Sequence, residues 1–524
     1  MRKNGVLLHI SSLPSKYGIG TLGKEAYKFV DFLKASGQSY WQTLPIGPTG
    51  FGDSPYQSTS TYAGNPYFID FDLLAEEGLL KESDYNCYNW GEDITNVDYD
   101  IIYNIRFKIL REAYKNGFLR DYNKIQKFLK ENEYWLQDYS MFMAVKSYFN
   151  MEAYITWDMD IRIRKPEAIE KYSKFLKEEI EFQIYIQYLF YKQWFNLKLY
   201  ANKNHIEIVG DIPIYVAQDS VDAWCHPELF YLNQECIPIK VAGCPPDAFT
   251  DDGQLWGNPI YRWDVMKKDG YHWWISRIGA ASRMYDVVRI DHFRGLASYY
   301  AIEYGAKNAR IGEWIEAPGI ELFQVVRQEL PHVKIIAEDL GYLTEDVYEL
   351  MDKVGFPGMK ILLFAFGNHG DSEYIPYKIN KNCVAYIGTH DNDTFMGWIK
   401  EANEEEIHFA KKYMNLTLKE GYNWGIIRTL YGTQASTTIV QMQDILGLDN
   451  SARMNLPGTV GGNWKWRLRL EECSKELSNK LYELTKIFGR LGEYKNPEDI
   501  KIMDENKIDE RIKVKIDRKI KENI

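Results

Sequence analysis

The chain has 524 residues, and its 63 Lys and Arg residues against 74 Asp and Glu residues give a formal charge of −11. With 45% hydrophobic and 26% charged residues it has a globular composition, which excludes a mostly disordered chain, a collagen-like repeat and a small disulfide-stapled scaffold. The acidic charge argues against a nucleic-acid partner, because Lys and Arg dominate contacts with phosphate.

The first residues and the cysteines indicate where the protein acts. The apolar run that begins at Val6 is cut short at His9, so it falls below the ~7–15 apolar residues of a secretory signal peptide. No stretch approaches the ~20 apolar residues of a membrane-spanning helix. We therefore expect a cytoplasmic protein with reduced thiols. The scattered cysteines form no Cys-x-x-Cys pair and are Cys87, Cys225, Cys236, Cys244, Cys383 and Cys473.

Short apolar, β-branched runs recur along the chain, each followed by a helical pattern. Continuous apolar runs of this length are typical of parallel strands that are buried on both faces. Eight runs with helices between them favour an α/β fold of the (β/α)8 TIM-barrel type over an open sheet. The predicted strands are Val6–Ile10, Tyr40–Leu44, Glu207–Ile214, Val287–Phe293, Lys334–Leu340, Met359–Phe366, Val384–His390 and Thr437–Asp444.

A long stretch between the second and third predicted strands, about residues 70–205, contains no predicted strand. Helical patterns run through it over Ile101–Tyr114, Asp138–Tyr148 and Glu167–Tyr200. We predict that this stretch is a mainly helical insertion that lies over the C-terminal face of the barrel.

The end of the chain differs in composition from the rest. From about Lys495 it is rich in Ile, Lys, Asp and Glu, and isoleucines four residues apart, from Ile508 to Ile520, form one narrow stripe. We predict a catalytic barrel over residues 1–493 and a charged, helical tail over 494–524. A solvated tail is favoured, and a helix that binds a partner or another copy of the chain stays open.

Four predicted strands end in acidic residues. In a barrel enzyme the catalytic side chains lie at the C-terminal ends of the strands. A single acid there can simply mark where a strand meets solvent. Four on one face indicate a function, because converging like charges cost energy. These acids are Asp211, Asp291, Glu338 with Asp339, and Asp391 with Asp393.

Acids with His and Arg, but no Gly-rich phosphate loop, fit glycoside transfer by paired carboxylates or metal-assisted hydrolysis. The nine His residues form neither an HxH nor an HExxH pattern. Arg289, two residues before Asp291, suits a cation that keeps a nucleophilic carboxylate ionised. Most of the aromatic residues, 15% of the chain, belong to the core, but a few can stack on sugars. We therefore expect sugar chemistry with no metal and no cofactor.

Long motifs in a fixed order carry a resemblance to a known family. The motifs are Gly52–Gln57, Ala63–Tyr67, Gly210–Val216, Gln254–Pro259, Arg289–Gly295, Ala337–Gly341, Gly388–Asp393 and Arg453–Thr459. With these motifs the chain resembles the amylomaltases, also called 4-α-glucanotransferases or disproportionating enzymes, of glycoside hydrolase family 77. The resemblance spans about residues 2–492.

The resemblance implies a retaining double displacement on α-1,4-glucans, with maltooligosaccharides as partners. Asp291 matches the family's nucleophile, Glu338 the general acid/base, and Asp391 a third carboxylate that holds sugar hydroxyls. The other residues that it places around the sugars are Tyr56, Asp211, Trp256, Arg289, His390, Asn455 and Pro457. A retaining mechanism also requires carboxylates ~5–5.5 Å apart, an ionised nucleophile and a protonated acid. We expect burial and nearby carboxylates to raise the pKa of Glu338.

Residues 243–259 are predicted to form a lid loop on the acceptor side. Glycines flank this loop, prolines stiffen one arm, and Phe249 and Trp256 offer faces for an acceptor sugar. The alternative is that Trp256 anchors an ordinary surface loop. The family often has two adjacent aromatic residues where this chain has Ala248 and Phe249, which leaves acceptor preference and product size open.

Two further functions use the same residues. An α-amylase-like retaining hydrolase has the same three carboxylates and differs only in whether water or a sugar resolves the intermediate. A non-catalytic glucan-binding protein on the same fold is the second alternative, and the presence of all three carboxylates argues against it. The sequence does not determine donor length, cyclic products or the oligomeric state.

Overall fold

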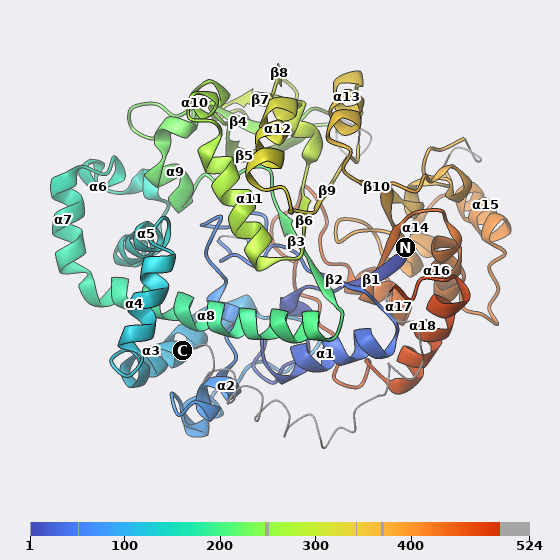
Figure 1. Ribbon diagram of the computed structural model, residues 1–524, viewed down its shortest axis with the longest axis horizontal. Helices are drawn as coiled ribbons and strands as arrows, with labels where there is room; N and C mark the ends of the chain where they lie inside the picture. Colours follow the sequence, from blue (N-terminus) through green and yellow to red (C-terminus); the bar gives the residue numbers. More distant parts are fainter. Residues whose placement is uncertain (1, 51, 247–250, 342, 368–370, 493–524) are drawn as a thin grey trace.

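The protein is described here by a computed structural model (Figure 1). The structure describes residues 2–50, 52–246, 251–341, 343–367 and 371–492. Phe249 and the predicted tail, residues 494–524, lie outside the described residues.

Eight parallel strands form the barrel that the apolar runs predict. The strands are β1 (Lys3–Leu7), β2 (Tyr40–Gln42), β3 (Glu207–Ile212), β6 (Val287–Ile290), β9 (Ile335–Ala337), β10 (Gly358–Ile361), β11 (Cys383–Tyr386) and β12 (Thr437–Gln441). Their hydrogen-bonded order is β10-β11-β12-β1-β2-β3-β6-β9. The α/β barrel prediction is thereby confirmed.

The barrel strands end earlier than the apolar runs predict. β6 stops at Ile290 rather than at Phe293, because His292 leaves the extended conformation for a left-handed one with φ 49°. β9 and β11 likewise stop at Ala337 and Tyr386. The predicted catalytic acids therefore stand just beyond the ladders, where their side chains are not constrained to alternate across a sheet.

The first and last strands of this order, β10 and β9, contact each other without forming a regular ladder. The backbone N–H of Ala337 donates to the carbonyl of Pro357 at 3.0 Å. The carboxylate of Asp339 accepts a hydrogen bond from the N–H of Met359 at 2.6 Å. A Cβ on Gly358 would lie 2.4 Å from that carboxylate, so this close approach requires glycine. These contacts link β9 to β10 and complete the barrel.

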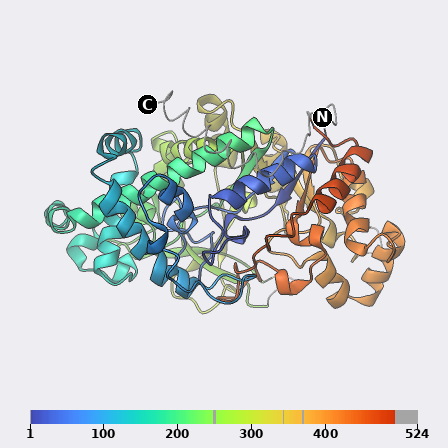
Figure 2. The ribbon, with the colours of Figure 1, turned by 90° about the horizontal axis from the view of Figure 1, so that it is seen from below.

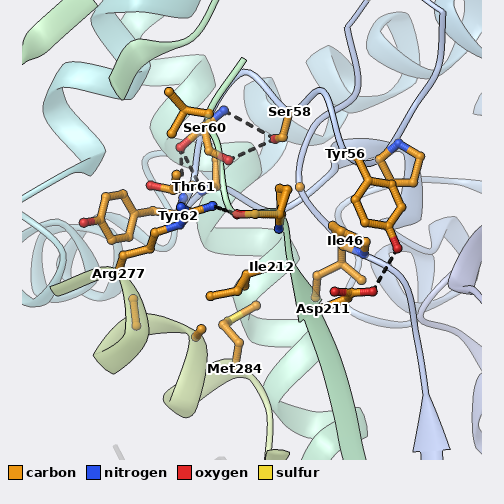
Figure 3. A pocket seen from close by; sticks show the side chains of 18 of the residues that line it. Ile46, Tyr56, Ser58, Ser60, Thr61, Tyr62, Asp211, Ile212, Arg277 and Met284 are labelled. Carbon is orange, nitrogen blue, oxygen red and sulfur yellow. Dashed lines mark hydrogen bonds between the residues drawn. The ribbon is translucent and has the colours of Figure 1, made fainter. Parts of the chain in front are cut away.

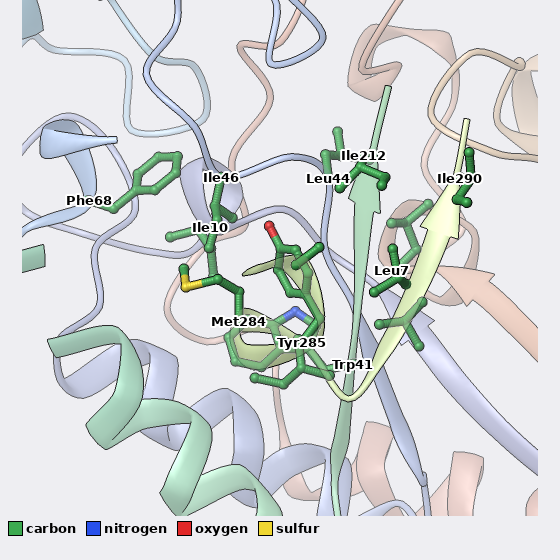
Figure 4. Packing of buried hydrophobic residues seen from close by; sticks show 14 of the residues in the cluster. Leu7, Ile10, Trp41, Leu44, Ile46, Phe68, Ile212, Met284, Tyr285 and Ile290 are labelled. Carbon is green, nitrogen blue, oxygen red and sulfur yellow. The ribbon is translucent and has the colours of Figure 1, made fainter. Parts of the chain in front are cut away.

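Large apolar side chains fill the barrel and the space below its helices (Figure 4). Trp41, on β2, is buried and donates its indole N–H to the carbonyl of Leu8 at 2.8 Å. Tyr285 covers β3 so closely that a Cβ on Gly210 would lie 2.1 Å from its ring. This packing fixes the strands whose ends carry the acids.

Eleven helices of the described residues surround the barrel or cap its ends. They are α1 (Lys24–Ala35), α9 (Val221–Cys225), α10 (Trp263–Lys268), α11 (His272–Met284), α12 (Gly319–Glu329), α13 (Glu345–Val354), α14 (Phe395–Glu401), α15 (Glu404–Met414), α16 (Tyr422–Gly432), α17 (Met442–Leu446) and α18 (Lys475–Ile487).

Between β2 and β3 the described chain is helical, without a barrel strand. The helices are α2 (Phe71–Glu76), α3 (Tyr99–Gly117), α4 (Tyr122–Glu131), α5 (Leu136–Tyr148), α6 (Met159–Arg162), α7 (Pro166–Phe175) and α8 (Lys177–Lys203). The single helix expected over 167–200 is two helices that meet at Leu176. Figures 1 and 2 show this region at one end of an elongated molecule, with α14–α16 at the other end and the barrel strands between.

A second, antiparallel sheet was not predicted. It has the order β5-β4-β7-β8 and contains β4 (Lys240–Cys244), β5 (Gln254–Pro259), β7 (Ser298–Glu303) and β8 (Glu313–Glu316). Residues 243–259, expected as one loop, therefore include the end of β4 and all of β5. The backbone pairing of Gly243 with Leu255 turns the arms of this segment into a hairpin, which fixes Trp256 on a strand.

Candidate active site

Asp291 and Glu338 follow neighbouring barrel strands. β6 and β9 are parallel partners in which Ile290 is paired with Ala337, so the two acids leave the barrel side by side. The N–H of Glu338 donates to the carbonyl of Ile290 at 3.1 Å, which continues the register by one residue. Adjacent strands are ~4.8 Å apart, a spacing compatible with the ~5 Å between carboxyl groups that a retaining mechanism needs.

Asp291 is held by the buried guanidinium of Arg289. One nitrogen of Arg289 donates to Oδ1 of Asp291 at 2.9 Å. Burial raises the pKa of the Asp291 carboxyl from its ordinary value to about 6, and the nearby carboxylates of Asp211 and Asp391 act in the same direction. Arg289 opposes this rise, as the sequence spacing predicts, so Asp291 is largely ionised near neutral pH.

Glu338 is buried and both of its carboxyl oxygens accept backbone hydrogen bonds. The N–H of His292 donates to Oε2 at 2.7 Å, and the N–H of Leu340 donates to Oε1 at 2.9 Å. Burial, followed by the charge of Asp291, raises the pKa of Glu338 to about 8 despite these hydrogen bonds and Arg289. Glu338 is therefore the protonated member of the pair near neutral pH, as an acid requires.

Asp211 lies beneath the two acids on β3, and its side chain has no exposed surface. Its Oδ2 accepts hydrogen bonds from Arg289 and from the hydroxyl of Tyr56, the latter at 2.8 Å (Figure 3). A pocket behind this contact extends from Tyr56 and Asp211 toward Tyr62 and Arg277. In this structure Asp211 fixes a cation and an aromatic ring of the site.

Asp391 is ionised by its neighbours. Burial raises the pKa of its carboxyl, but the adjacent His390 and hydrogen bonds from His390 and Asn455 outweigh burial and lower the pKa to about 2. Nδ2 of Asn455 donates to Oδ1 of Asp391 at 2.6 Å, and Nε2 of His390 lies 3.3 Å from Oδ2. Nη2 of Arg453 also donates to the backbone carbonyl of Asp391 at 2.6 Å.

Aromatic rings line two sides of the site. Tyr56 stacks on His390 with 5.0 Å between ring centroids and 15° between planes, and Trp464 packs against both rings. On another side the partly buried Trp256 meets the ring of His292 edge to face, with centroids 4.7 Å apart. Flat faces of this kind suit the apolar faces of sugar rings.

Two predicted residues are not placed with the carboxylates by the structure. Pro457 lies in an exposed stretch that follows Asn455, and Phe249 is outside the described residues. The remaining predicted residues are brought together at the C-terminal ends of the strands, where each makes a contact described above.

Cys225 and His226, neighbours in the sequence, lie away from the acids. Nη1 of Arg164 donates to Sγ of Cys225 at 3.0 Å, and burial raises the pKa of this thiol. His226 is paired with Glu228. Among the described residues no group of three or more His, Cys, Asp and Glu side chains could hold a metal ion. The absence of a metal or cofactor stays a prediction.

Sequence reasoning gave no role to three residues that shape the site: Arg453, Trp464 and His292. Arg453 and His292 fall inside motifs, but nothing in their spacing shows what they contact. Trp464 adopts φ 63°, an uncommon conformation for a bulky residue, and its backbone N–H donates to the carbonyl of Met454 at 2.6 Å. The signal in the sequence that could have pointed to Trp464 is its position just after Gly461 and Gly462.

Comparison with known proteins gives a consistent result along the chain. The family model described as 4-alpha-glucanotransferase matches residues 8–472. A 4-alpha-glucanotransferase from Clostridium butyricum is 51% identical over 485 residues, which cover 92% of this chain and 100% of the relative. One from Streptococcus pneumoniae serotype 4 is 47% identical over 495 residues, covering 94% and 98%.

A solved structure is similar over the same range. The amylomaltase from Streptococcus agalactiae, in complex with acarbose, superposes with a TM-score of 0.92 at 46% identity. The match covers 94% of this chain and 100% of that one.

Proposed function

The chain belongs to the 4-alpha-glucanotransferase family, glycoside hydrolase family 77, and on that premise we propose how its residues carry out the reaction. As a 4-alpha-glucanotransferase it moves α-1,4-glucan segments from a donor to an acceptor by a retaining double displacement. The observation that supports the assignment of roles is the pairing of Asp291 with Glu338 on adjacent strand ends, with the higher pKa on Glu338.

In the first step Asp291 attacks the anomeric carbon of the donor. Its carboxylate forms a bond to that carbon while the bond to the leaving oxygen breaks, and Glu338 gives its proton to that oxygen. Arg289, held by Asp211, keeps Asp291 ionised. Asp391 is ionised and partly exposed, which supports its assignment, together with Tyr56, to holding the sugar ring.

In the second step the acceptor replaces the first leaving group. Glu338, now deprotonated, takes the proton from an acceptor hydroxyl, whose oxygen attacks the anomeric carbon and frees Asp291. The two inversions give net retention of the α-configuration. Maltooligosaccharides and longer α-1,4-glucans fit both roles, because donor and acceptor share one chemistry.

A maltotriose digest tests transfer against hydrolysis. Transfer yields glucose together with glucans longer than maltotriose, whereas an α-amylase-like hydrolase yields only shorter products. Thin-layer chromatography with a reducing-end assay separates the two outcomes. A digest that contains no glucans longer than maltotriose would support hydrolysis.

Trp256 is expected to favour transfer over hydrolysis. If an acceptor sugar stacks on its indole, Trp256→Ala removes a contact worth on the order of 1–3 kcal/mol. Acceptor binding should weaken and the share of hydrolysis should rise, with a smaller effect on formation of the intermediate. The measurement compares new reducing ends with redistributed chain lengths in a maltotriose digest. An unchanged ratio would show that the hairpin of β4 and β5 does not gate water.

The pKa values predict a bell-shaped dependence of kcat/KM on pH. Activity should fall below pH about 6, where Asp291 becomes protonated and cannot attack, and above about 8, where Glu338 loses the proton that it must donate. The measurement is kcat/KM for maltotriose at constant ionic strength from pH ~4 to ~10. A profile without an alkaline limb would contradict the role of Glu338 as the acid.

We also propose that the protein acts in the cytoplasm. The cysteines of the described residues form no disulfide bond, and no described helix is long and apolar enough to cross a membrane. Free thiols are typical of a reducing compartment.

A further inference from the structure

His292 lies between the nucleophile and the acceptor-side tryptophan, and the steps above give it no role. It directly follows Asp291 and adopts the left-handed conformation, φ 49° and ψ 46°. Its carbonyl accepts a hydrogen bond from the N–H of Gly295 at 2.9 Å, which closes a tight turn. A residue with a Cβ keeps such a conformation only where its surroundings hold it.

Two further contacts connect His292 to the acid/base and to the acceptor-side tryptophan. On one side its backbone N–H donates to Oε2 of Glu338 at 2.7 Å. On the other its ring meets the indole of Trp256 edge to face, with 83° between planes. The donor and the ring belong to one residue, so a single residue links the indole of Trp256 to the N–H that holds Glu338.

The imidazole of His292 is uncharged near neutral pH. Burial, together with the positive charge of Arg294, lowers its pKa to about 3. A neutral imidazole packs against an indole without a desolvation cost for charge. It is also not poised to exchange protons with Glu338, so the geometry indicates a structural link rather than a second acid/base.

We propose that His292 is a positioning residue that couples acceptor binding at Trp256 to the orientation of Glu338. This proposal rests on the function proposed above. A sugar stacked on Trp256 fixes the indole, which fixes the ring of His292 and so the N–H that aligns the Glu338 carboxylate toward the acceptor hydroxyl. Water makes no stacking contact with Trp256 and leaves Glu338 less well aligned. His292 therefore raises the ratio of transfer to hydrolysis.

The test separates the ring from the backbone of His292. Asn tolerates the left-handed conformation, so His292→Asn keeps the N–H contact with Glu338 and removes the aromatic edge; His292→Gly is the second variant. With an α-maltosyl fluoride donor we expect fluoride release to fall less than about threefold. With maltotriose the ratio of transfer to hydrolysis should fall about tenfold, because a sugar bound at Trp256 no longer aligns Glu338.

His205→Asn is the matched control. His205 has φ 60° and lies just before β3, at the opposite end of the barrel from the acids. The same substitution in the same backbone conformation should leave the transfer ratio at the wild-type value.

A double variant tests whether the two residues act as one unit. If His292 acts through Trp256, His292→Asn combined with Trp256→Ala should have the same hydrolysis share as Trp256→Ala alone. Independent, multiplying effects would overturn the proposal. So would an unchanged transfer ratio in His292→Asn, or a loss of fluoride release as large as the loss of transfer. Failure of the proposed function would look different, because the wild-type enzyme would then form no glucans longer than maltotriose.

Discussion

Replacing Asp291 with Asn is expected to lower kcat/KM for maltotriose by about 10⁴-fold or more, with little change in glucan binding. The amide has nearly the size and shape of the carboxylate, but it cannot attack the anomeric carbon. Arg289 keeps its hydrogen bond to Asp211, so the cation beneath the site stays in place. The aromatic rings that face the sugars are unchanged.

Steady-state kinetics and calorimetric titration with maltotriose measure the two quantities separately. Asp286→Asn is the matched control, because Asp286 precedes the opposite end of the same strand, β6, where it accepts a hydrogen bond from the N–H of Ile208 at 2.7 Å. That variant should retain activity. Near-normal turnover by Asp291→Asn would remove Asp291 from the mechanism.

Replacing Glu338 with Gln is expected to separate donors by their leaving groups. Transfer from maltotriose should fall by about 10³-fold or more, because nothing protonates the leaving sugar oxygen. A donor with fluoride as leaving group needs little protonation, so it should still form the glycosyl-enzyme. The comparison is kcat/KM for maltotriose against the burst of fluoride release.

Azide provides a positive readout for the same variant. It attacks the anomeric carbon without a general base, so it should restore turnover of the fluoride donor and yield a glycosyl azide of retained α-configuration. Failure of azide to accelerate turnover, together with an equal loss on both donors, would contradict the role of Glu338 as acid/base.

Folding can be checked on the Glu338→Gln protein. Because the pKa of Glu338 is raised in the folded state, the stability of the protein falls as the pH rises from the ordinary pKa to about 8 and stays lower above it. Gln cannot ionise, which removes this cost, but its amide nitrogen cannot accept the hydrogen bond of one of the two backbone N–H groups that hold Glu338. An unfolding temperature well above that of the assay shows that the variant is folded. A loss of activity is then a loss of chemistry.

The barrel could be predicted because its strands are buried on both faces. A run such as Val384–Ile387 is continuously apolar, and that signal does not depend on distant contacts. The second sheet gave no such signal. β8 is only Glu313–Glu316, an edge strand whose residues are mostly exposed, and its place is set by pairing with β7. Short edge strands are determined by their partners.

The identity of the site residues came from their motifs, but their contacts did not. Asp211 and Tyr56 are 155 positions apart, and their hydrogen bond exists only because β3 and the loop before α2 meet in the barrel. The position of His292 next to Asp291 was visible, but its left-handed conformation was not, and its contact with Trp256 depends on the hairpin of the unpredicted sheet.

The pKa values of the site could likewise be predicted only in part from the sequence. The spacing of Arg289 and Asp291 predicts a cation that favours the ionised carboxylate, and this effect is present. Burial acts against it and raises the pKa of Asp291 to about 6. The carboxylates of Asp211 and Asp391, which the barrel brings near, act in the same direction as burial. Local sequence does not encode the extent of burial.

Trapping the glycosyl-enzyme tests the double displacement most directly. In Glu338→Gln the first step with α-maltosyl fluoride is fast and the second lacks its base, so the intermediate should accumulate. After acid quench and proteolysis, mass spectrometry should find the peptide that contains Asp291 heavier by one maltosyl group. A maltosyl group on another residue, or fluoride release with no covalent adduct, would contradict the mechanism.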